Sequence, residues 1–387
     1  MRSARKDLIK VVLWNIGFVS FLIIFGLIIL EIYLNTFTRY AKNREINVKD
    51  ELIKNIYKES GLNDQNIRTL LKNTYLYSDA QVNGNFLYDS HLGFRETPRS
   101  TKFVNISKYG FRRTSKELPK DEDFFPSKPI NNKIQTPKDK PFRIYLFGGS
   151  TTFGYGVTDE QTIASQIEKK YFGSKVFNFG RGFYYSEQEN ILLDRMMKFG
   201  AIKPDLVIFF DGLNERGTIA IFQEMMNNVF NNISNPYFNW SFSEKFKPLY
   251  GLVDELAKQF PRTNDRGLDL GEFEYSEYNL PPIKLSMIFK SNLLTRDIIC
   301  KKYSLDCVTF LQPHPGEKSI HSLQSEKSRQ KYINKFKILQ SVDHDYVDFT
   351  GALEKYNKHA YVDNVHYSPK ASEIIADKIV GYIKANR

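Results

Sequence analysis

The chain has 387 residues, of which 41% are hydrophobic and 26% charged, and it contains two cysteines. This composition is typical of a folded protein with a sizeable core. It excludes a collagen-like chain, a disulfide-dense secreted scaffold and a multi-cysteine zinc or iron–sulfur domain. The formal net charge of +11 permits an anionic partner, a membrane surface or a nucleic acid, but it requires none of them.

The segment from Val11 to Leu30 carries no charge and has the length that a helix needs to cross a membrane. A buried core helix and a cleaved signal peptide are the alternatives. Such a run is rarely apolar on every face in a soluble fold, and no small-residue cleavage site follows it. Basic residues lie on both sides, with a slight excess before it. We therefore expect a cytoplasmic tail (1–10), an uncleaved signal anchor (11–33) and the remainder of the chain outside the cytoplasmic membrane.

Three zones follow the predicted anchor. Residues 34–115 are expected to form a small extension, with helices over Val48–Leu62 and Asp64–Asn73 and paired LGFR and YGFR phrases around short strand-like pieces. Residues 116–140 are rich in Lys, Asp and Pro, which predicts an exposed linker. Residues 141–387 form the third zone, with a long aromatic-rich insertion at about 216–300. That insertion is either a lid or sugar-stacking wall, or a helical pair that covers a sheet.

From residue 141 short apolar strands alternate with helices. Strands are expected over Phe142–Phe147, Lys175–Phe179, Asp205–Phe210, Cys307–Leu311 and Tyr346–Phe349, and helices over Ile163–Tyr171, Ser186–Phe199 and Lys370–Ala385. Ser368 is placed to cap the last helix, with Pro369 in its first turn. This alternation predicts a five-stranded parallel sheet covered on both faces, with its functional site at the carboxyl ends of the strands.

Cys300 ends a predicted helix and Cys307 starts a predicted strand. They can form a disulfide in a compartment outside the cytoplasm, or they can remain two half-buried thiols. The sequence leaves both alternatives open.

The residues suited to chemistry follow the predicted strands. Ser150 lies at a glycine turn after FRIYLFGG, and neither a nucleotide-binding glycine motif nor the lipase G-x-S-x-G elbow occurs there. Asp363 and His366 form the phrase DNVH before the last helix; a serine nucleophile needs such a base, and the base needs a carboxylate that holds its tautomer. Asn214 follows the third strand, where its amide can donate to an oxyanion or form a turn.

Four blocks, FGGST, NFGRG, DGLNE and DNVH, occur in this order along the chain. Together they resemble the SGNH/GDSL hydrolase family over about residues 141–387. The resemblance implies a flavodoxin-like α/β/α sandwich that hydrolyses acyl esters through a serine acyl-enzyme. It implies Ser150 as nucleophile, His366 as base and Asp363 as the residue that orients it. The main-chain N–H of Ser150, the amide of Asn214 and an N–H from the NFGRG block would form the oxyanion hole.

Three departures from the family pattern stand out. Gly149 replaces the aspartate that usually precedes the nucleophile, and Glu215 follows Asn214 where the family often has aspartate. In the NFGRG block an ungapped comparison puts Phe183 on the usual oxyanion glycine, with Gly182 one position early. Either residue can supply the N–H donor. The LGFR and YGFR phrases are similar to those of membrane-anchored members that act outside the cytoplasm on acylated sugars or polymers.

The leading hypothesis is therefore a membrane-anchored serine esterase, with an acylated small molecule or an O-acetylated glycan as substrate. An O-acyltransferase of an extracytoplasmic polysaccharide would use the same triad, and a non-catalytic tethered binding module is a third alternative. No cofactor and no metal site are expected, since His314 and His321 lack a pattern of paired ligands. No nucleic-acid partner is expected, because the basic residues are scattered in stretches of mixed sign.

Overall fold

The computed structural model describes residues 54–57, 60–74, 86–89, 92–114, 141–215, 282–316, 326–356, 358–363 and 365–387, with a few helical residues between 14 and 33. The predicted linker 116–140 and most of the predicted anchor lie outside these ranges. Within the described part of the chain, no helix combines the length and apolarity needed to cross a membrane. The N-terminal helical residues belong to one compact unit, and all described residues from 54 onward belong to a second, which is described below.

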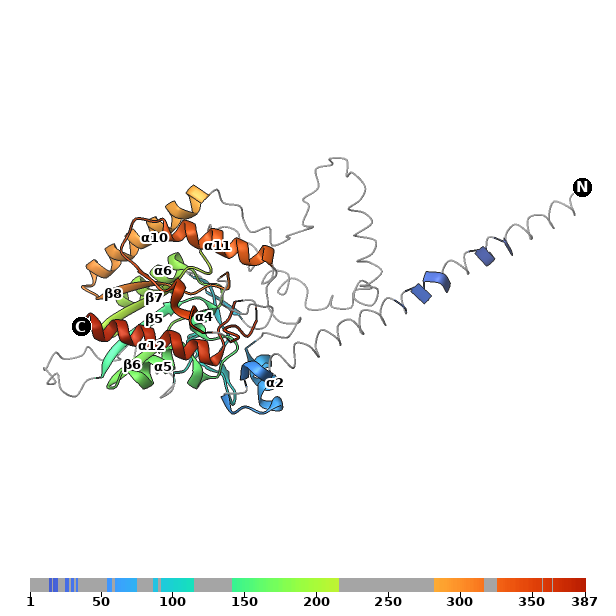
Figure 1. Ribbon diagram of the computed structural model, residues 1–387, viewed down its shortest axis with the longest axis horizontal. Coiled ribbons are helices and arrows are strands. Elements are labelled where there is room, and N and C mark those ends of the chain that lie inside the picture. The colour runs from blue at the N-terminus through green and yellow to red at the C-terminus, as the bar shows by residue number, and fades with distance from the viewer. Residues whose placement is uncertain are drawn as a thin grey trace, which may run out of the picture. The chain divides into compact units, whose positions relative to one another are not determined.

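The predicted five-stranded parallel sheet is confirmed. Its strands are β5 (Phe142–Gly148), β6 (Ser174–Asn178), β7 (Leu206–Asp211), β8 (Cys307–Leu311) and β9 (Val347–Asp348). They lie in the order β6-β5-β7-β8-β9, and every neighbouring pair is parallel (Figure 1). The chain passes from β5 outward to β6 and then returns to the other side of β5 for β7. In open α/β sheets, functional sites form at the carboxyl ends of the strands beside such a reversal, here β5 and β7.

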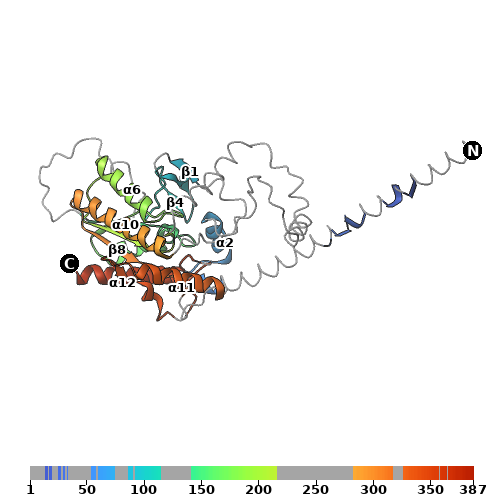
Figure 2. The same ribbon diagram turned by 90° about the horizontal axis from the view of Figure 1, so that it is seen from above.

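Alternation along the central strands produces two hydrophobic cores. The even-numbered residues of β5 and β7 pack against α5 (Ile163–Lys170) and α12 (Pro369–Ala385). The odd-numbered residues pack against α6 (Ser186–Lys198) and the end of α10 (Pro282–Lys302). Figure 2 shows the two helical layers on opposite sides of the sheet. Successive side chains of a strand point to opposite faces, so two such layers bury both faces of these strands.

The remaining elements complete the layers and the turns. They are α4 (Ser150–Phe153), η3 (Asp159–Gln161), α11 (Glu326–Gln340) and η4 (Thr350–Leu353). Helix α11 packs against α10 through a core that includes Phe289, Leu293, Phe336 and Leu339. The Ser368 hydroxyl accepts the Ala371 N–H at the start of α12, as the sequence predicts.

The segment before the sheet consists of α2 (Asp64–Asn73), the hairpin β1 (Phe86–Asp89)–β2 (Gly93–Glu96) and the hairpin β3 (Arg99–Ser100)–β4 (Asn105–Ile106). Helix α2 has the predicted bounds. The other predicted helix, over Val48–Leu62, is described only in part: residues 54–57 are helical, and the α-helix does not continue through 60–62. The phenylalanines of the LGFR and YGFR phrases are buried in the same core as the odd-numbered residues of β5. The first hairpin and the sheet therefore share one hydrophobic core, whereas Ile106 of the second hairpin packs in a separate cluster with Phe153 and Tyr155.

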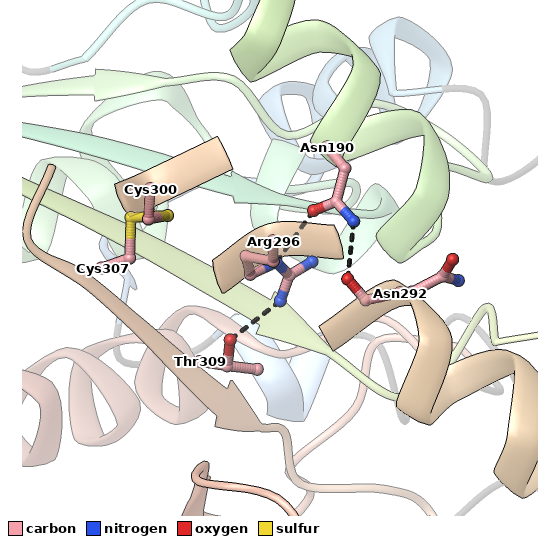
Figure 3. The surroundings of a disulfide bond; sticks show 6 residues. All are labelled: Asn190, Asn292, Arg296, Cys300, Cys307 and Thr309. Carbon is pink, nitrogen blue, oxygen red and sulfur yellow. Dashed lines mark hydrogen bonds between the residues drawn. A yellow bond between two sulfur atoms is a disulfide. The ribbon is translucent and has the colours of Figure 1, made fainter. Parts of the chain in front are cut away.

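A disulfide joins Cys300, in the last turn of α10, to Cys307, the first residue of β8 (Figure 3). One turn before it, Arg296 is buried and forms an ion pair with Asp211 at 2.6 Å. The same guanidinium donates to Asn190 Oδ1 at 3.0 Å and to Thr309 Oγ1 at 2.9 Å. The disulfide and the polar contacts of Arg296 together link α10 to the sheet.

Candidate active site

Ser150 is the first residue of α4, directly after β5. The turn between them has no room for side chains, because a Cβ on Gly148 would overlap the Thr152 side chain and lie 3.0 Å from the Phe210 carbonyl oxygen. Thr151 Oγ1 then donates to Gln312 Oε1 at 2.7 Å, which ties α4 to the end of β8. The glycines allow the chain to turn sharply at the strand end, and Ser150 therefore lies at the carboxyl end of β5.

Asp363 and His366 lie in a tight loop before α12. Main-chain bonds from Val362 N to the His366 carbonyl and from Ser368 N to the Ala360 carbonyl, both 2.8 Å, close the loop. Within it, Asp363 Oδ1 accepts the N–H of Val365 at 2.8 Å and that of His366 at 2.7 Å. An aspartate three residues before the histidine can thus bind the main chain with one oxygen and keep the other for the imidazole.

The structure brings these three residues into one hydrogen-bonded chain. His366 Nδ1 lies 2.6 Å from Asp363 Oδ2, and His366 Nε2 lies 2.8 Å from Ser150 Oγ. Burial alone would raise the pKa of Asp363, but the neighbouring His366 and the loop N–H groups hold that pKa below its usual value. The carboxylate is therefore ionised and accepts the Nδ1 proton, which leaves Nε2 free to accept the serine proton.

Asn214 follows β7 and lies beside the nucleophile. Its Nδ2 donates one proton to the Tyr184 carbonyl at 2.9 Å, and a Cβ on Gly149 would overlap the same nitrogen. This close approach means that a side chain at position 149 would displace the amide. The N–H of Ser150, at the first position of α4, has no partner within the helix. An amide and a main-chain N–H thus flank the serine.

The NFGRG block presents one of its two candidate donors. The Gly182 N–H donates to Glu96 Oε1 at 2.9 Å and is therefore occupied. No acceptor among the described residues receives the Phe183 N–H. Phe183 has φ of +63°, a left-handed conformation that is uncommon for a residue other than glycine, and its side chain is 36% exposed. Of the two alternatives left open by the sequence, the geometry favours Phe183.

Two residues near the triad were not recognised from the sequence. The Tyr155 ring lies against the His366 ring, with centroids 5.1 Å apart, and its hydroxyl donates to Glu96 Oε1 at 2.9 Å. Glu96 comes from β2, and the only sequence signal for it is its place directly after LGFR.

His314, which lacks a pattern of paired metal ligands in the sequence, is buried in a stack on Phe336, and burial lowers its pKa to about 4. The described residues include no cluster suited to a metal ion.

The site therefore combines a hydroxyl, a base held by a carboxylate, and donors beside the hydroxyl. This set can transfer an acyl group: the base activates the oxygen nucleophile, and the donors stabilise a developing oxyanion. The parts come from four segments, namely the ends of β5 and β7, the loop after β6, and the loop before α12. The carboxyl ends of parallel strands meet at one edge of the sheet, and this edge brings them together.

Comparison with known proteins gives fold-level likenesses of low score. No protein-family model matches the chain, and no curated protein is similar to it in sequence. Among solved structures, an acetyl xylan esterase is 14% identical with a TM-score of 0.33, over 62% of this chain and 99% of that one. A member of the lipolytic G-D-S-L family from Veillonella parvula is 10% identical with a TM-score of 0.35, over 62% and 96%.

An inhibitor-bound aryl esterase from M. smegmatis is 12% identical with a TM-score of 0.35, over 63% of this chain and 98% of that chain. At such low identities and TM-scores these likenesses establish neither a family nor an activity for the chain. The function proposed below rests on the geometry of the triad.

Proposed function

We propose that the protein is a serine esterase of SGNH type that cleaves acyl esters through an acyl-enzyme. The observation that carries the proposal is the continuous chain of hydrogen bonds from Ser150 through His366 to Asp363. A serine and a histidine 216 residues apart in sequence lie 2.8 Å apart. The carboxylate that holds the histidine also accepts two main-chain N–H groups, so the base has a fixed tautomer and orientation.

In the first half of the reaction, Ser150 Oγ forms a bond to the carbonyl carbon of the ester while His366 Nε2 takes the hydroxyl proton. The carbonyl oxygen becomes an oxyanion that accepts hydrogen bonds from Ser150 N, Phe183 N and Asn214 Nδ2. The tetrahedral intermediate then collapses, the bond to the alcohol oxygen breaks, and His366 returns the proton to that oxygen. The acyl group remains on Ser150.

In the second half, water takes the place of the departed alcohol. His366 removes a proton from the water, and the hydroxide oxygen bonds to the acyl carbon. Collapse of the second intermediate breaks the bond to Ser150 Oγ, which recovers its proton from His366, and the carboxylic acid leaves. A sugar hydroxyl in the position of water would produce an acyltransferase with the same residues, so the two activities differ in the acceptor.

The proposal extends to the compartment. We infer an anchor over Val11–Leu30 and a catalytic part outside the cytoplasmic membrane. The uncharged run supports the anchor. The Cys300–Cys307 disulfide supports the compartment, because structural disulfides persist in oxidising environments and are rare in the cytosol. A C-terminal reporter that is active only in the cytoplasm should stay silent, and an active reporter would contradict the inferred topology.

For the substrate we propose an O-acetylated glycan. The support is the half-exposed Phe183 ring in the loop after β6, which packs edge-on against Phe86 at 6.0 Å and can offer an apolar face to a sugar ring. The matching test compares acetylated oligosaccharides with p-nitrophenyl acetate, for the wild type and Phe183→Ala. Loss of turnover confined to the oligosaccharides supports a glycan substrate, whereas an equal loss on both contradicts it.

The experiment on the esterase itself uses the full chain in detergent. Wild type should hydrolyse p-nitrophenyl acetate and react with a fluorophosphonate at Ser150, and Ser150→Ala should do neither while retaining its circular dichroism spectrum. Ser341→Ala is the matched control, since Ser341 is exposed at the end of α11. A folded Ser150→Ala protein with full hydrolysis would refute the triad. A wild type that reacts with fluorophosphonate but turns over no ester would indicate a transferase.

A further inference from the structure

Glu96, the last residue of β2, is a buried carboxylate outside the triad. It is fully buried, and its Oε1 accepts two hydrogen bonds, from Gly182 N and from the Tyr155 hydroxyl, both 2.9 Å long. Its Oε2 has no hydrogen-bond partner among the described residues. Burial raises the pKa of this carboxyl to about 7, against the lowering effect of those two bonds and of Arg181 and Arg112. Burying a carboxyl group with one oxygen left without a hydrogen bond lowers the stability of the fold, which suggests that Glu96 has a role other than stability.

The first of the two bonds acts on the oxyanion loop. Gly182 is immediately before Phe183, whose N–H is the donor that this loop presents. A Cβ on Gly182 would lie 2.5 Å from the Tyr155 hydroxyl oxygen and 3.0 Å from Glu96 Oε1, so the loop backbone rests directly on this pair. Because neighbouring peptide planes share a Cα, a bond that fixes the Gly182 N–H restricts the direction of the Phe183 N–H.

The same strand also holds the rest of this loop. Two residues of β2, Phe94 and Glu96, bind this loop, and Leu92, directly before β2, binds α6, which follows the loop. The Leu92 carbonyl accepts from Gln188 Nε2 at 2.9 Å, and the Phe94 carbonyl accepts from the Tyr184 hydroxyl at 2.6 Å. Of these residues, Glu96 is the one that binds the peptide N–H directly before the donor.

The second bond acts on the base. Tyr155 follows the turn after α4, and its N–H donates to the Ser150 carbonyl at 3.2 Å. Its ring lies against the His366 imidazole at a tilt of 42°. The Glu96 oxygen that fixes the tyrosine hydroxyl therefore also fixes the surface on which the imidazole rests.

We propose that Glu96 is a positioning residue that aligns the oxyanion donor of Phe183 and, through Tyr155, the imidazole of His366. This role rests on the proposed esterase activity and deepens it. Glu96 touches no reacting atom, and one of its oxygens serves both sides of the nucleophile. The N-terminal hairpin is thereby part of the active-site machinery.

The test compares two buried glutamates in the full chain in detergent. Glu96→Ala removes both bonds, whereas Glu168→Ala removes the bond that the buried Glu168 of α5 accepts from Val176 N at 2.8 Å, away from the triad. For Glu96→Ala we expect kcat and the rate of fluorophosphonate labelling to fall by about 10- to 100-fold, with KM changed less than about threefold. Glu168→Ala should retain both rates per folded molecule, even if its melting temperature falls as much as that of Glu96→Ala.

Rescue by the conservative variant separates positioning from packing. Glu96→Gln keeps an oxygen that can accept both bonds, so its rates should stay within about threefold of the wild type. Tyr155→Phe keeps the ring and removes one bond, so its loss should be smaller than that of Glu96→Ala. A folded Glu96→Ala protein with wild-type labelling and turnover refutes the role.

Equal losses of kcat for Glu96→Ala and Glu168→Ala also refute it, because they would reflect stability alone. Failure of the esterase proposal appears differently. In that case Ser150→Ala would retain full activity, or the wild type would neither hydrolyse esters nor react with the phosphonate, and the positioning role would be overturned with it.

Discussion

Arg112 provides the sharpest test of how the N-terminal hairpins hold the site. The residue is fully buried and pairs with Asp159 at 2.8 Å. Its other nitrogens donate to the carbonyls of Gly154 and Val157, both at 2.7 Å. These carbonyls belong to the turn that follows the helix of the nucleophile. Arg112→Met would leave the buried Asp159 charge without its cation and these two carbonyls without this donor.

Removal of one partner from a buried ion pair costs about 3 to 5 kcal/mol, and each buried carbonyl left unpaired adds about 1 kcal/mol or more. The Gly154 carbonyl keeps the N–H of Val157 at 3.4 Å, so only the Val157 carbonyl adds to the cost of the broken ion pair. We therefore expect Arg112→Met to lower the free energy of unfolding by at least about 4 kcal/mol. Arg95 of the LGFR phrase is the matched control, because its guanidinium binds the Lys108 carbonyl near the surface. Arg95→Met should cost about 0.5 kcal/mol.

Urea unfolding of the full chain in detergent, followed by far-ultraviolet circular dichroism, measures both costs. Adding Asp159→Asn to Arg112→Met should restore part of the stability, because the uncompensated charge disappears. The reasoning is refuted if the two arginine variants are equally stable. It is refuted also if the second substitution makes the first worse.

Three further predictions concern the donors, the buried carboxyl and the disulfide. Asn214→Ala should lower kcat by about 10²- to 10³-fold. Gly149→Ala, which displaces the same amide, should also lower kcat. Both proteins should keep their circular dichroism spectra. Burial raises the pKa of Glu96 from 4.5 to about 7, so the folded state binds this proton more tightly than the unfolded state. The resulting stabilisation is complete below about pH 4.5 and lost as the pH rises through about 7, a decrease on the order of 3 kcal/mol that Glu96→Gln should abolish in unfolding titrations. Replacing Cys300 and Cys307 by serine should lower the free energy of unfolding by about 2 kcal/mol, as expected for so short a closed loop, and dithiothreitol should reproduce the loss in the wild type; no change with either treatment would contradict it.

The strands of the sheet were predictable because each is a short apolar run with a turn or glycine after it. Helix α12 was predictable for a different reason, since Ser368 and Pro369 mark its start. A helix that ends at Cys300 was predicted without its bounds, and helix α11 was not predicted. Helix α10 exposes Met287 and Ile298 while it buries Leu285, so apolar residues occur on more than one face and the helical period is obscured.

The triad residues could be singled out from their places at predicted strand ends and before the last helix. The oxyanion donor could not, because the choice between Gly182 and Phe183 depends on Glu96, a residue 86 positions away in sequence. No local pattern marks a carboxylate as the partner of a distant peptide group. The paired LGFR and YGFR phrases were expected around short strand-like pieces, and the buried charged residues Glu96 and Arg112, which follow one phrase and end the other, were not singled out.

The distance along the chain between Ser150 and His366 has a consequence for biosynthesis. The two are separated by 216 residues, so the serine leaves the ribosome long before its base. At about 5 to 20 residues per second, the delay is roughly 10 to 40 s. During that time the hydroxyl has no group to take its proton and is a weak nucleophile. Under the proposed function, a nascent chain therefore carries the serine in an inert form, and the proposed reactivity toward esters begins only when the loop before α12 folds against the end of β5.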